Sequence, residues 1–440
     1  MRNKYIGNSI WIIAGKILQS LIALIVGAIT ARYLGPSNYG IINYVAAYVT
    51  FFSCIANLGM NSTVVNELLM SPENTGKIIG TMTLAKLIAS AISAVLVTGI
   101  VAVVDHGENA VVIVAAIYSS YLVFQSFQTF EYWYQSRLQS KVTALVGVLA
   151  YIIMSAYKVI LLVTRASVYW FAFSMSVDVI IISVVLLILY KKHKGPKLEI
   201  SWSLFRELFA RSRPFILAGL IQVIYTKTDT IMLKHILDTT EVGIYTCAST
   251  LVGYGSLVMI AVTDSARPAV ITAKQQGDEL YIRRVRQVFS ITFLAGVLIG
   301  LGFTIMSNPM VSIIYGEEYL GSIQPMIILA WNSMLVYITT VRNIWIVCEN
   351  KQKYTIIFCA LGAIVNILAN YFLIPAFGVS GAAIATTIAQ LISGIIAPCF
   401  FGETRIVVKF LVDAICFKNV LTPEEKLGIK NKIAQVFKRK

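Results

Sequence analysis

Seven charged side chains lie inside long apolar stretches of this 440-residue sequence, and five of the seven are basic. The basic residues are Lys16, Lys86, Lys158, Lys227 and Arg342, and the acidic residues are Asp178 and Asp229. A charge at the centre of a membrane helix costs at least about 2.5–3.5 kcal/mol, so such residues normally face protein or a water-filled cavity. The excess of positive charge is suited to binding an anion.

The apolar stretches themselves must position these charges. Each stretch is about 20 residues long, which is what an α-helix needs to cross a hydrocarbon core of roughly 30 Å. The sequence therefore predicts an all-α integral membrane protein with about twelve transmembrane helices. We expect them at residues 10–31, 40–60, 78–104, 110–130, 142–163, 169–190, 215–237, 242–262, 288–306, 326–347, 354–374 and 379–401.

Lysine and arginine residues are divided unevenly among the joints between these stretches. With the N-terminus in the cytoplasm, 28 of the 36 lie in cytoplasmic joints or the tail, three lie in outer joints and five lie inside spans. Positively charged segments resist translocation, so both the N- and C-termini are predicted to be cytoplasmic. The net charge of +15 is spread over many joints, whereas a nucleic-acid surface would gather it on one face. No nucleic-acid partner is therefore expected.

The longest basic joint divides the predicted helices into two sets of six. We expect an N-terminal six-helix bundle at residues 1–190, a cytoplasmic linker at 191–213, a C-terminal six-helix bundle at 214–401 and a basic cytoplasmic tail at 402–440. Aromatic residues recur at helical spacing in the linker, which predicts a short amphipathic helix on the inner membrane surface. The basic tail is predicted to lie on the anionic inner leaflet.

A faint internal repeat follows the first span of each half. Residues 34–41 match residues 237–244 at one offset of 203, with Leu, Gly and Ile in common. Six spans separate the copies, so both halves keep the same orientation, as in the parallel type of transporter repeat.

Several functional classes find no support in the sequence. Only 13% of the residues are charged, against about 25% in soluble globular proteins. The six cysteines form no CxxC pair, and neither a phosphate-binding loop motif for ATP nor an H-E-x-x-H zinc motif is present. The longest outer joint is residues 307–325, too short for the catalytic domain of a membrane polymerase. We therefore expect no enzyme, catalytic residue, cofactor or metal.

Four stretches give the sequence a family resemblance. Residues 31–40 (ARYLGPSNYG) are similar to the opening signature of the polysaccharide (O-antigen or capsule) repeat-unit flippases, the Wzx-like branch of the multidrug/oligosaccharidyl-lipid/polysaccharide (MOP) exporter superfamily. The other three stretches occur in the same order as in that family. They are residues 228–233 with 241–245, residues 315–319, and residues 366–375 with 381–386.

The resemblance implies a MOP/MATE-like fold, with two six-helix bundles around a central cavity. It also implies alternating-access transfer of undecaprenyl-pyrophosphate-linked oligosaccharide to the outer leaflet of the bacterial inner or plasma membrane, for O-antigen, capsule or exopolysaccharide synthesis. Membrane lipids, and polymerase and chain-length proteins of the same pathway, are the other partners that it suggests. The alternatives are a MATE-type exporter of small molecules, a peptidoglycan lipid-precursor flippase and, least favoured, a polysaccharide polymerase.

Depth in the membrane ranks the basic residues as candidates for the pyrophosphate. At about 1.5 Å per residue, Lys86, Lys16 and Arg342 lie about 12, 9 and 8 Å from the cytoplasmic ends of their helices, where an inner-leaflet lipid would load. Lys227 lies near mid-membrane. The competing interpretation for Lys16 and Arg342 is that they extend toward the membrane surface.

The remaining charges have two interpretations each. Asp229 is either a coupling-ion carboxylate or part of a packed polar seam. Lys158 and Asp178 lie on consecutive predicted helices and could form a structural pair. The aromatic residues at 132–134 are predicted to form an interfacial belt.

Overall fold

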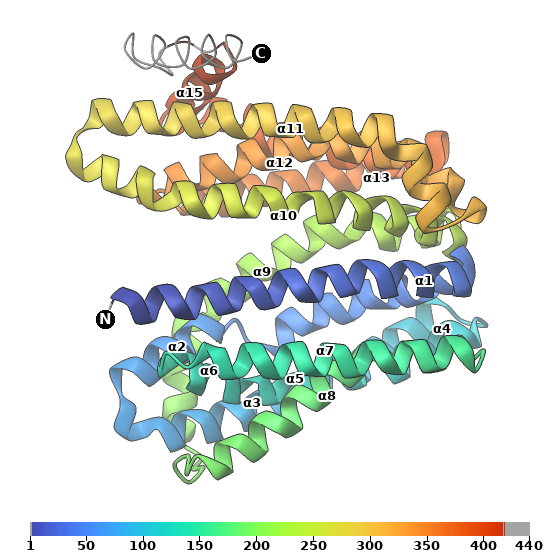
Figure 1. The fold of residues 1–440 in the computed structure, drawn as a ribbon, viewed down its shortest axis with the longest axis vertical. Coiled ribbons are helices and arrows are strands. Elements are labelled where there is room, and N and C mark those ends of the chain that lie inside the picture. The colour runs from blue at the N-terminus through green and yellow to red at the C-terminus, as the bar shows by residue number, and fades with distance from the viewer. Residues whose placement is uncertain (1, 417, 419–440) are drawn as a thin grey trace, which may run out of the picture. The chain divides into compact units, whose positions relative to one another are not determined.

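The computed structural model describes residues 2–416 and 418, and these residues form helices without strands (Figure 1). The side chains of residues 2–18, 21, 257, 258, 260, 261 and 264 lie outside the description. The long helices are α1 (Arg2–Ala56), α3 (Thr75–Val104), α7 (Ser140–Val163), α8 (Val168–Lys192), α9 (Trp202–Ile236), α10 (Thr239–Gln276), α11 (Asp278–Ile314), α12 (Ile323–Cys348) and α13 (Lys353–Leu391). The shorter helices are α2 (Asn61–Met70), α4 (Asn109–Tyr118), α5 (Ser120–Gln125), α6 (Thr129–Ser136), α14 (Ala397–Phe400) and α15 (Arg405–Ile415), with a π-helix at Ile392–Ile396.

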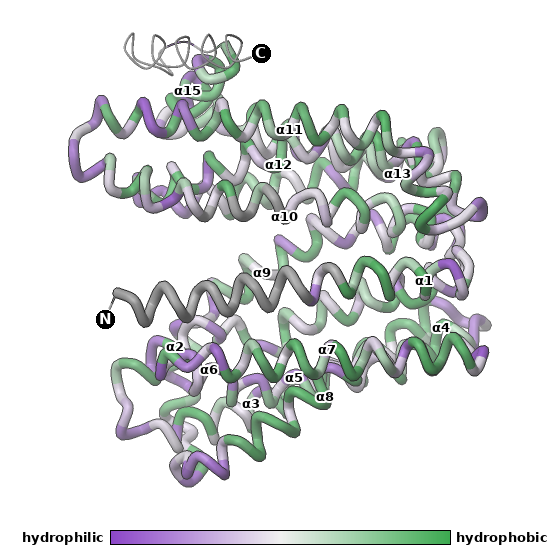
Figure 2. The backbone as a smooth tube through the Cα atoms, viewed as in Figure 1, coloured by the Kyte–Doolittle hydropathy of each residue, from purple (hydrophilic) through white to green (hydrophobic). Residues whose placement is uncertain are grey.

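Within the described residues, nine helical stretches are long and apolar enough to cross a membrane. Figure 2 shows hydrophobic residues along the long helices and hydrophilic residues gathered at the turns. These findings confirm the prediction of an all-α, multi-pass membrane protein. The number of twelve spans and the cytoplasmic position of the termini stay predictions.

Two of the long helices each cover two predicted spans. At 55 residues, α1 would be roughly 80 Å long if it were straight, which far exceeds a bilayer. It is interrupted at Gly35, where φ is +69°, and α13 is interrupted at Gly378, where φ is +58°. Glycine adopts such backbone angles without a steric penalty. Both glycines lie in predicted joints, and Figure 1 shows that the chain turns back within α1.

The contacts divide the chain into two compact units. The first unit comprises Met1–Thr246 and Ile313–Glu318, and the second comprises Cys247–Ser312 and Tyr319–Lys440. The predicted linker at 191–213 therefore lies within the first unit, where Glu199 N donates to Gly76 O (3.2 Å) and Ser201 N donates to Thr81 Oγ1 (2.9 Å). The two predicted bundles were divided by counting membrane spans and not by contacts, so this division stays a prediction.

The linker differs from its prediction in one respect. Instead of a separate amphipathic helix, the residues after Ser201 begin α9, which runs through Pro214 to Ile236 without a break. The Ser201 side chain caps the helix by accepting a hydrogen bond from Leu204 N.

The core of the first unit contains the aromatic residues that were predicted to form an interfacial belt. Tyr132, Trp133 and Tyr134 are at most 7% exposed and pack with Met60, Ile78 and other buried residues. The structure buries them in protein because they lie on α6, whose neighbours α2, α3, α7 and α8 cover it. The belt prediction is therefore wrong.

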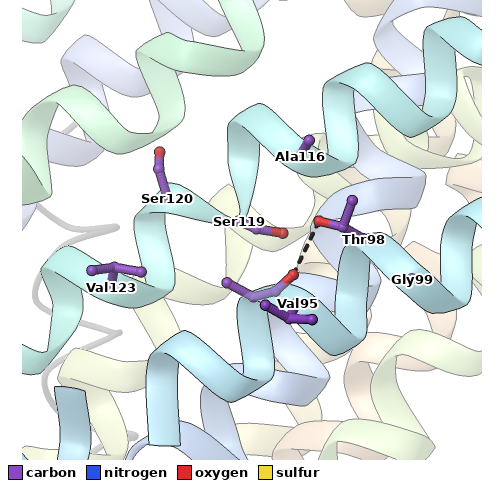
Figure 3. A pocket seen from close by; sticks show the side chains of 8 residues that line it. Val95, Thr98, Gly99, Ala116, Ser119, Ser120 and Val123 are labelled. Atoms are coloured by element: carbon purple, nitrogen blue, oxygen red, sulfur yellow. Dashed lines mark hydrogen bonds between the residues drawn. The ribbon is translucent and has the colours of Figure 1, made fainter. Parts of the chain in front are cut away.

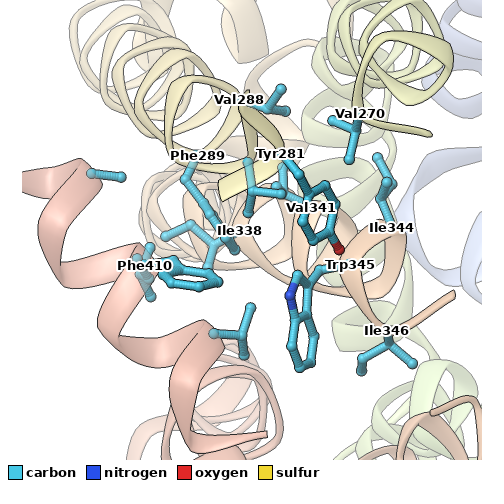
Figure 4. Close-up of a cluster of buried hydrophobic side chains, with 14 of the residues drawn as sticks. Val270, Tyr281, Val288, Phe289, Ile338, Val341, Ile344, Trp345, Ile346 and Phe410 are labelled. Carbon is cyan, nitrogen blue, oxygen red and sulfur yellow. The ribbon is translucent and has the colours of Figure 1, made fainter. Parts of the chain in front are cut away.

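The core of the second unit includes part of the predicted tail. Phe410, on α15, packs in the same cluster as Phe289 and Ile338 (Figure 4). An ion pair of 2.6 Å between Arg286 and Asp413 holds the same helix. The prediction that the tail lies on the lipid surface is thus wrong for the buried face of α15, because that face is apolar enough to join the core. Residues 419–440 of the tail lie outside the described residues.

Candidate anion site in the first helical unit

Lys86 is buried in the interior of the first unit and is surrounded by neutral oxygen atoms. Its side chain lies on α3, and the residue is 1% exposed. The ammonium donates to Asn61 Oδ1 (3.0 Å), Asn57 Oδ1 (3.4 Å) and Tyr132 Oη (3.4 Å), and it lies 4.8 Å from the centre of the Tyr132 ring. These three acceptors match the three donors of an ammonium group.

The chain brings these acceptors to Lys86 through a sharp turn. Leu58 and Gly59 both have positive φ between the end of α1 and the start of α2, so Asn57 and Asn61 lie on either side of the turn. Tyr132 comes from α6. Among the described residues, no carboxylate oxygen forms an ion pair with Lys86 within 4.0 Å. The site therefore holds a buried ammonium that is solvated by hydrogen bonds, and the described residues bring no negative counter-charge to it.

An open cavity whose lining residues are mostly of polar types adjoins this charge. Its volume is about 310 Å³, and its lining residues are Asn61, Ser62, Val65, Asn66, Tyr132 and Gln135. Asn61 and Tyr132 line the cavity and also bind Lys86. A group in this cavity is therefore separated from the ammonium by a single layer of neutral side chains. Since side-chain amides and hydroxyls can donate hydrogen bonds, the lining is chemically suited to an anion.

A second cavity, of about 570 Å³, lies between α3 and the α4–α5 segment. Its lining is mainly small and apolar, and Thr98 Oγ1 donates to the Ala94 carbonyl (3.0 Å) instead of pointing a free hydrogen into the cavity (Figure 3). Ser119 Oγ likewise donates to the Ala115 carbonyl (2.6 Å). None of the described residues that line this cavity is charged. This lining is poorly suited to an anion.

Arg342 lies in the second unit, and its guanidinium group binds backbone carbonyls. It donates to Ser393 O (2.5 Å) and Gly394 O (3.2 Å), both in the π-helix, and it is 4% exposed. A π-helix breaks the regular pattern of backbone hydrogen bonds. Arg342 satisfies carbonyls at that break, so the geometry favours a structural role over contact with a ligand.

The other candidates are dispersed. Lys227 and Asp229 both lie on α9, where Asp229 is buried and accepts a 2.7 Å hydrogen bond from Tyr245 Oη. Lys158 and Asp178 lie on the packed helices α7 and α8, but no ion pair of 4.0 Å or less joins them among the described residues. The side chain of Lys16 lies outside the described residues. Among the predicted residues that the structure describes, Lys86 shares two hydrogen-bond partners, Asn61 and Tyr132, with a cavity.

A further charged cluster was missed by sequence reasoning. It joins Asp105 and Glu108, between α3 and α4, to Lys234 and His235 on α9 and to Tyr44 on α1. In the sequence, Asp105 lies in an outer joint, and Lys234, counted with the outer residues, lies in the last turn of the predicted span 215–237. Charged side chains at such positions are normally solvated. The only available signal was that Lys234 is one of just three basic residues on the predicted outer side.

The family assignment follows from a match over more than half of the chain. The family model described as "Polysaccharide biosynthesis protein" matches residues 6–270. The chain belongs to this family. The match includes α1 through α9 and therefore every residue of the Lys86 site. It confirms the predicted resemblance to the polysaccharide flippases.

Three relatives of this chain are named as flippases or as polysaccharide biosynthesis proteins. The capsular polysaccharide biosynthesis protein CapF of Staphylococcus aureus is 20% identical over 406 residues, which cover 88% of this chain and 96% of CapF. The lipid II flippase MurJ of Bacillus subtilis is 24% identical over 215 residues, which cover 45% of this chain and only 39% of MurJ. A probable low-salt glycan biosynthesis flippase, Agl15 of Haloferax volcanii, is 21% identical over 43% of this chain and 41% of Agl15.

Solved structures show the fold of the family member. An inward-facing multidrug resistance transporter of the MATE family and MOP superfamily aligns with a TM-score of 0.66 and 14% identity, covering 90% of this chain and 96% of that one. The lipid II flippase MurJ in an inward closed conformation aligns with a TM-score of 0.61 and 13% identity, covering 93% and 91%. The predicted MOP/MATE-like fold is confirmed.

Proposed function

We propose that this polysaccharide biosynthesis protein carries an undecaprenyl-pyrophosphate-linked oligosaccharide from the cytoplasmic to the outer leaflet of the bacterial inner or plasma membrane. The observation that supports this most is the match to CapF, which extends over 96% of that protein, together with the family match at residues 6–270. The excess of basic residues inside the apolar stretches agrees with a cargo that bears a diphosphate.

The physical problem is the head group of the cargo. A diphosphate and many sugar hydroxyls cannot cross hydrocarbon, because each unpaired polar group costs several kcal/mol and a bare charge costs far more. A transporter overcomes this by offering a polar path that opens to one side at a time. The polyprenyl chain stays in the lipid while the head group moves along the protein.

Lys86 is proposed to receive the pyrophosphate when the cargo loads. An anion in the 310 Å³ cavity would replace a neutral acceptor, Asn61 or Tyr132, at the ammonium. The ammonium already donates to neutral acceptors, so an anion adds the Coulomb attraction between opposite charges, which is much stronger in a protein interior than in water. The exchange is therefore favourable only for an anion, and neutral lipids gain nothing from it.

The proposal treats the other predicted residues differently. Arg342 stabilises the π-helix, Lys227 stays a candidate contact along the path, and Asp229 stays a candidate for coupling. Polymerase and chain-length proteins of the same pathway are proposed as the partners that consume the translocated unit. A peptidoglycan lipid precursor, suggested by the likeness to MurJ, is the second candidate cargo.

One experiment separates these cargoes. In a deletion strain, the lipid-linked unit that the protein normally moves should accumulate on the inner leaflet, and its chemical structure names the cargo. We expect an oligosaccharide linked to undecaprenyl pyrophosphate. Accumulation of lipid II would favour the peptidoglycan precursor, and a deletion that traps no lipid-linked sugar but sensitises cells to organic cations would favour a drug exporter.

A further inference from the structure

The charged cluster around Lys234 plays no part in the proposed transport of the pyrophosphate. The Lys234 ammonium forms ion pairs with Asp105 and with Glu108, the latter at 2.7 Å. The side chains of Lys234 and Asp105 are 8% and 0% exposed, whereas that of Glu108 is 49% exposed. The cluster thus fastens the last turn of α9 to the segment between α3 and α4, at the end that the charge pattern predicts to be outer.

A chain of hydrogen bonds links this cluster to the surface. Tyr44 on α1 is completely buried, and its hydroxyl donates to Asp105 Oδ2 (2.8 Å). The same hydroxyl lies 2.9 Å from His235 Nε2 and 3.3 Å from Tyr48 Oη. His235 is exposed. An exposed imidazole is therefore connected through one phenol to a buried carboxylate.

The charges of the cluster do not balance while His235 is neutral. Two carboxylates, Asp105 and Glu108, face one ammonium, Lys234. Among the described residues, these three charged groups act on His235, the Tyr44 phenol contacts its ring, and Tyr48 contacts Tyr44 in turn. Protonation of the imidazole brings the net charge of the cluster from −1 to zero. Histidine is the side chain whose ordinary titration lies near neutral pH, so it is the group suited to this change.

Protonation also decides where the Tyr44 hydrogen points. The phenol has one hydrogen, which can go to Asp105, to His235 or, over the longer distance of 3.3 Å, to Tyr48. A neutral imidazole with its hydrogen on Nδ1 competes for it through Nε2. An imidazolium has hydrogens on both nitrogens, so it must donate to Tyr44, and the Tyr44 hydrogen is then directed to Asp105. The protonated state therefore allows one arrangement, in which His235 donates to Tyr44 and Tyr44 donates to Asp105, whereas a neutral imidazole adopts it in only one of its two tautomers.

We propose that His235, Tyr44 and Asp105 form a proton-binding site, and that the bound proton tightens the contact between α1 and α9 at the predicted outer end of the first unit. One N–H bond forms on the imidazole, and the proton comes from the solvent on the predicted outer side. No oxidant, metal or second ligand is required. The inference is independent of the cargo, since none of these residues lies at the Lys86 site.

The test uses a buried reporter on α1 and two variants that fix the charge. Val45, next to Tyr44, is completely buried, and a Val45→Cys change in a chain without its six native cysteines reports opening through labelling by a membrane-impermeant maleimide. His235→Lys keeps a positive charge at all relevant pH values, and His235→Gln is always neutral. Comparing the variants at the same pH cancels the intrinsic pH dependence of the thiol.

We expect the chain with native His235 to label as slowly as the Lys variant near pH 5 and as fast as the Gln variant near about pH 8. The two limits should differ by about fivefold or more, the range of typical coupling between two sites. A Tyr44→Phe change, which removes the hydroxyl but keeps the ring, should abolish the difference between the Lys and Gln variants. The matched control is His106→Gln, because His106 is exposed and adjacent to Asp105.

Labelling that follows the same pH profile in the native and Gln forms would overturn the proposal. So would an effect that persists in Tyr44→Phe, or one that is lost in His106→Gln. Because the readout is accessibility and not transport, a failure here leaves the proposed function untouched. Conversely, a different cargo would leave this result unchanged.

Discussion

Gly40 packs against the backbone at Thr239, and Gly243 packs in the same way against the backbone at Pro36. A Cβ atom on Gly40 would lie 1.7 Å from Thr239 O, and one on Gly243 would lie 2.0 Å from Pro36 O. Gly40 and Gly243 are equivalent positions of the internal repeat, and so are Pro36 and Thr239. Such an exchange of contacts is what a local two-fold axis produces. The two copies of the repeat thus pair with each other inside the first unit, and Ser37 Oγ lies 3.3 Å from Thr239 Oγ1 beside them.

Because of this contact, we expect a single added methyl group to lower the stability of the fold strongly. Gly40→Ala or Gly243→Ala forces backbone atoms apart, and overpacking of this kind costs typically about 1–3 kcal/mol. We expect a clearly lower midpoint of thermal unfolding in detergent for either variant. The matched control is Gly27→Ala on α1, where nothing lies within 4 Å of the new atom. Equal unfolding temperatures for Gly27→Ala and Gly40→Ala would show that the two repeat copies do not approach this closely.

We predict different effects for removing α15 and for removing only the residues that follow it. Truncation after Asn419 keeps α15 and should leave transport largely intact. Truncation after Gly402 removes Phe410 and Asp413 and exposes the apolar surface around Phe289. We expect the shorter protein to accumulate poorly, and surface polysaccharide to fall with it. Normal protein levels without α15 would mean that the helix is dispensable for folding, and loss of polysaccharide after the Asn419 truncation would give the last residues a role beyond anchoring.

Orientation in the membrane can be tested by cysteine labelling of intact cells. Because Lys and Arg are concentrated on one side, positions near Gly35, Gly107 and Gly316 should react with an impermeant reagent from outside. Positions near Lys194 and Lys274 should react only after the membrane is opened. External labelling near Lys194 is the result that the predicted topology does not allow.

Sequence reasoning predicted the fold well, because long apolar stretches, their joints and the repeat are local patterns. It singled out Lys86 by sign and depth, but not its partners Asn57, Asn61 and Tyr132, which come together only through tertiary packing. Tyr132 was assigned to the membrane surface because the sequence alone does not distinguish an aromatic residue in a protein core from one at the membrane interface. The contact of Arg342 with the π-helix could not be predicted, because no sequence pattern marks the residues that form a π-helix.

The network of Asp105, Lys234 and His235 shows a second limit. Each residue lies at the end of an apolar stretch, where charged side chains are ordinary and need no partner. Only the fold shows that Asp105 is buried and that two distant segments meet there. A pattern of single charges at helix ends cannot distinguish solvated residues from paired ones.

The central claim is that the buried charge of Lys86 draws a diphosphate into the neighbouring cavity. Its most direct test is binding of undecaprenyl pyrophosphate to the purified protein in nanodiscs, for the native chain, Lys86→Gln and Lys86→Arg. Gln keeps much of the side-chain length without the charge, and Arg keeps the charge with a different geometry. Lys191→Gln, an exposed lysine beyond the apolar part of α8, is the matched control for loss of one charge.

We predict that Lys86→Gln folds with native thermal stability to within a few degrees but binds undecaprenyl pyrophosphate about tenfold or more weakly, since a hydrogen bond to a charged group contributes about 1.5–3 kcal/mol. Lys86→Arg should retain part of the affinity, and Lys191→Gln should retain all of it. If folded Lys86→Gln binds the pyrophosphate lipid as tightly as the native protein, Lys86 serves helix packing alone and the anion is received elsewhere.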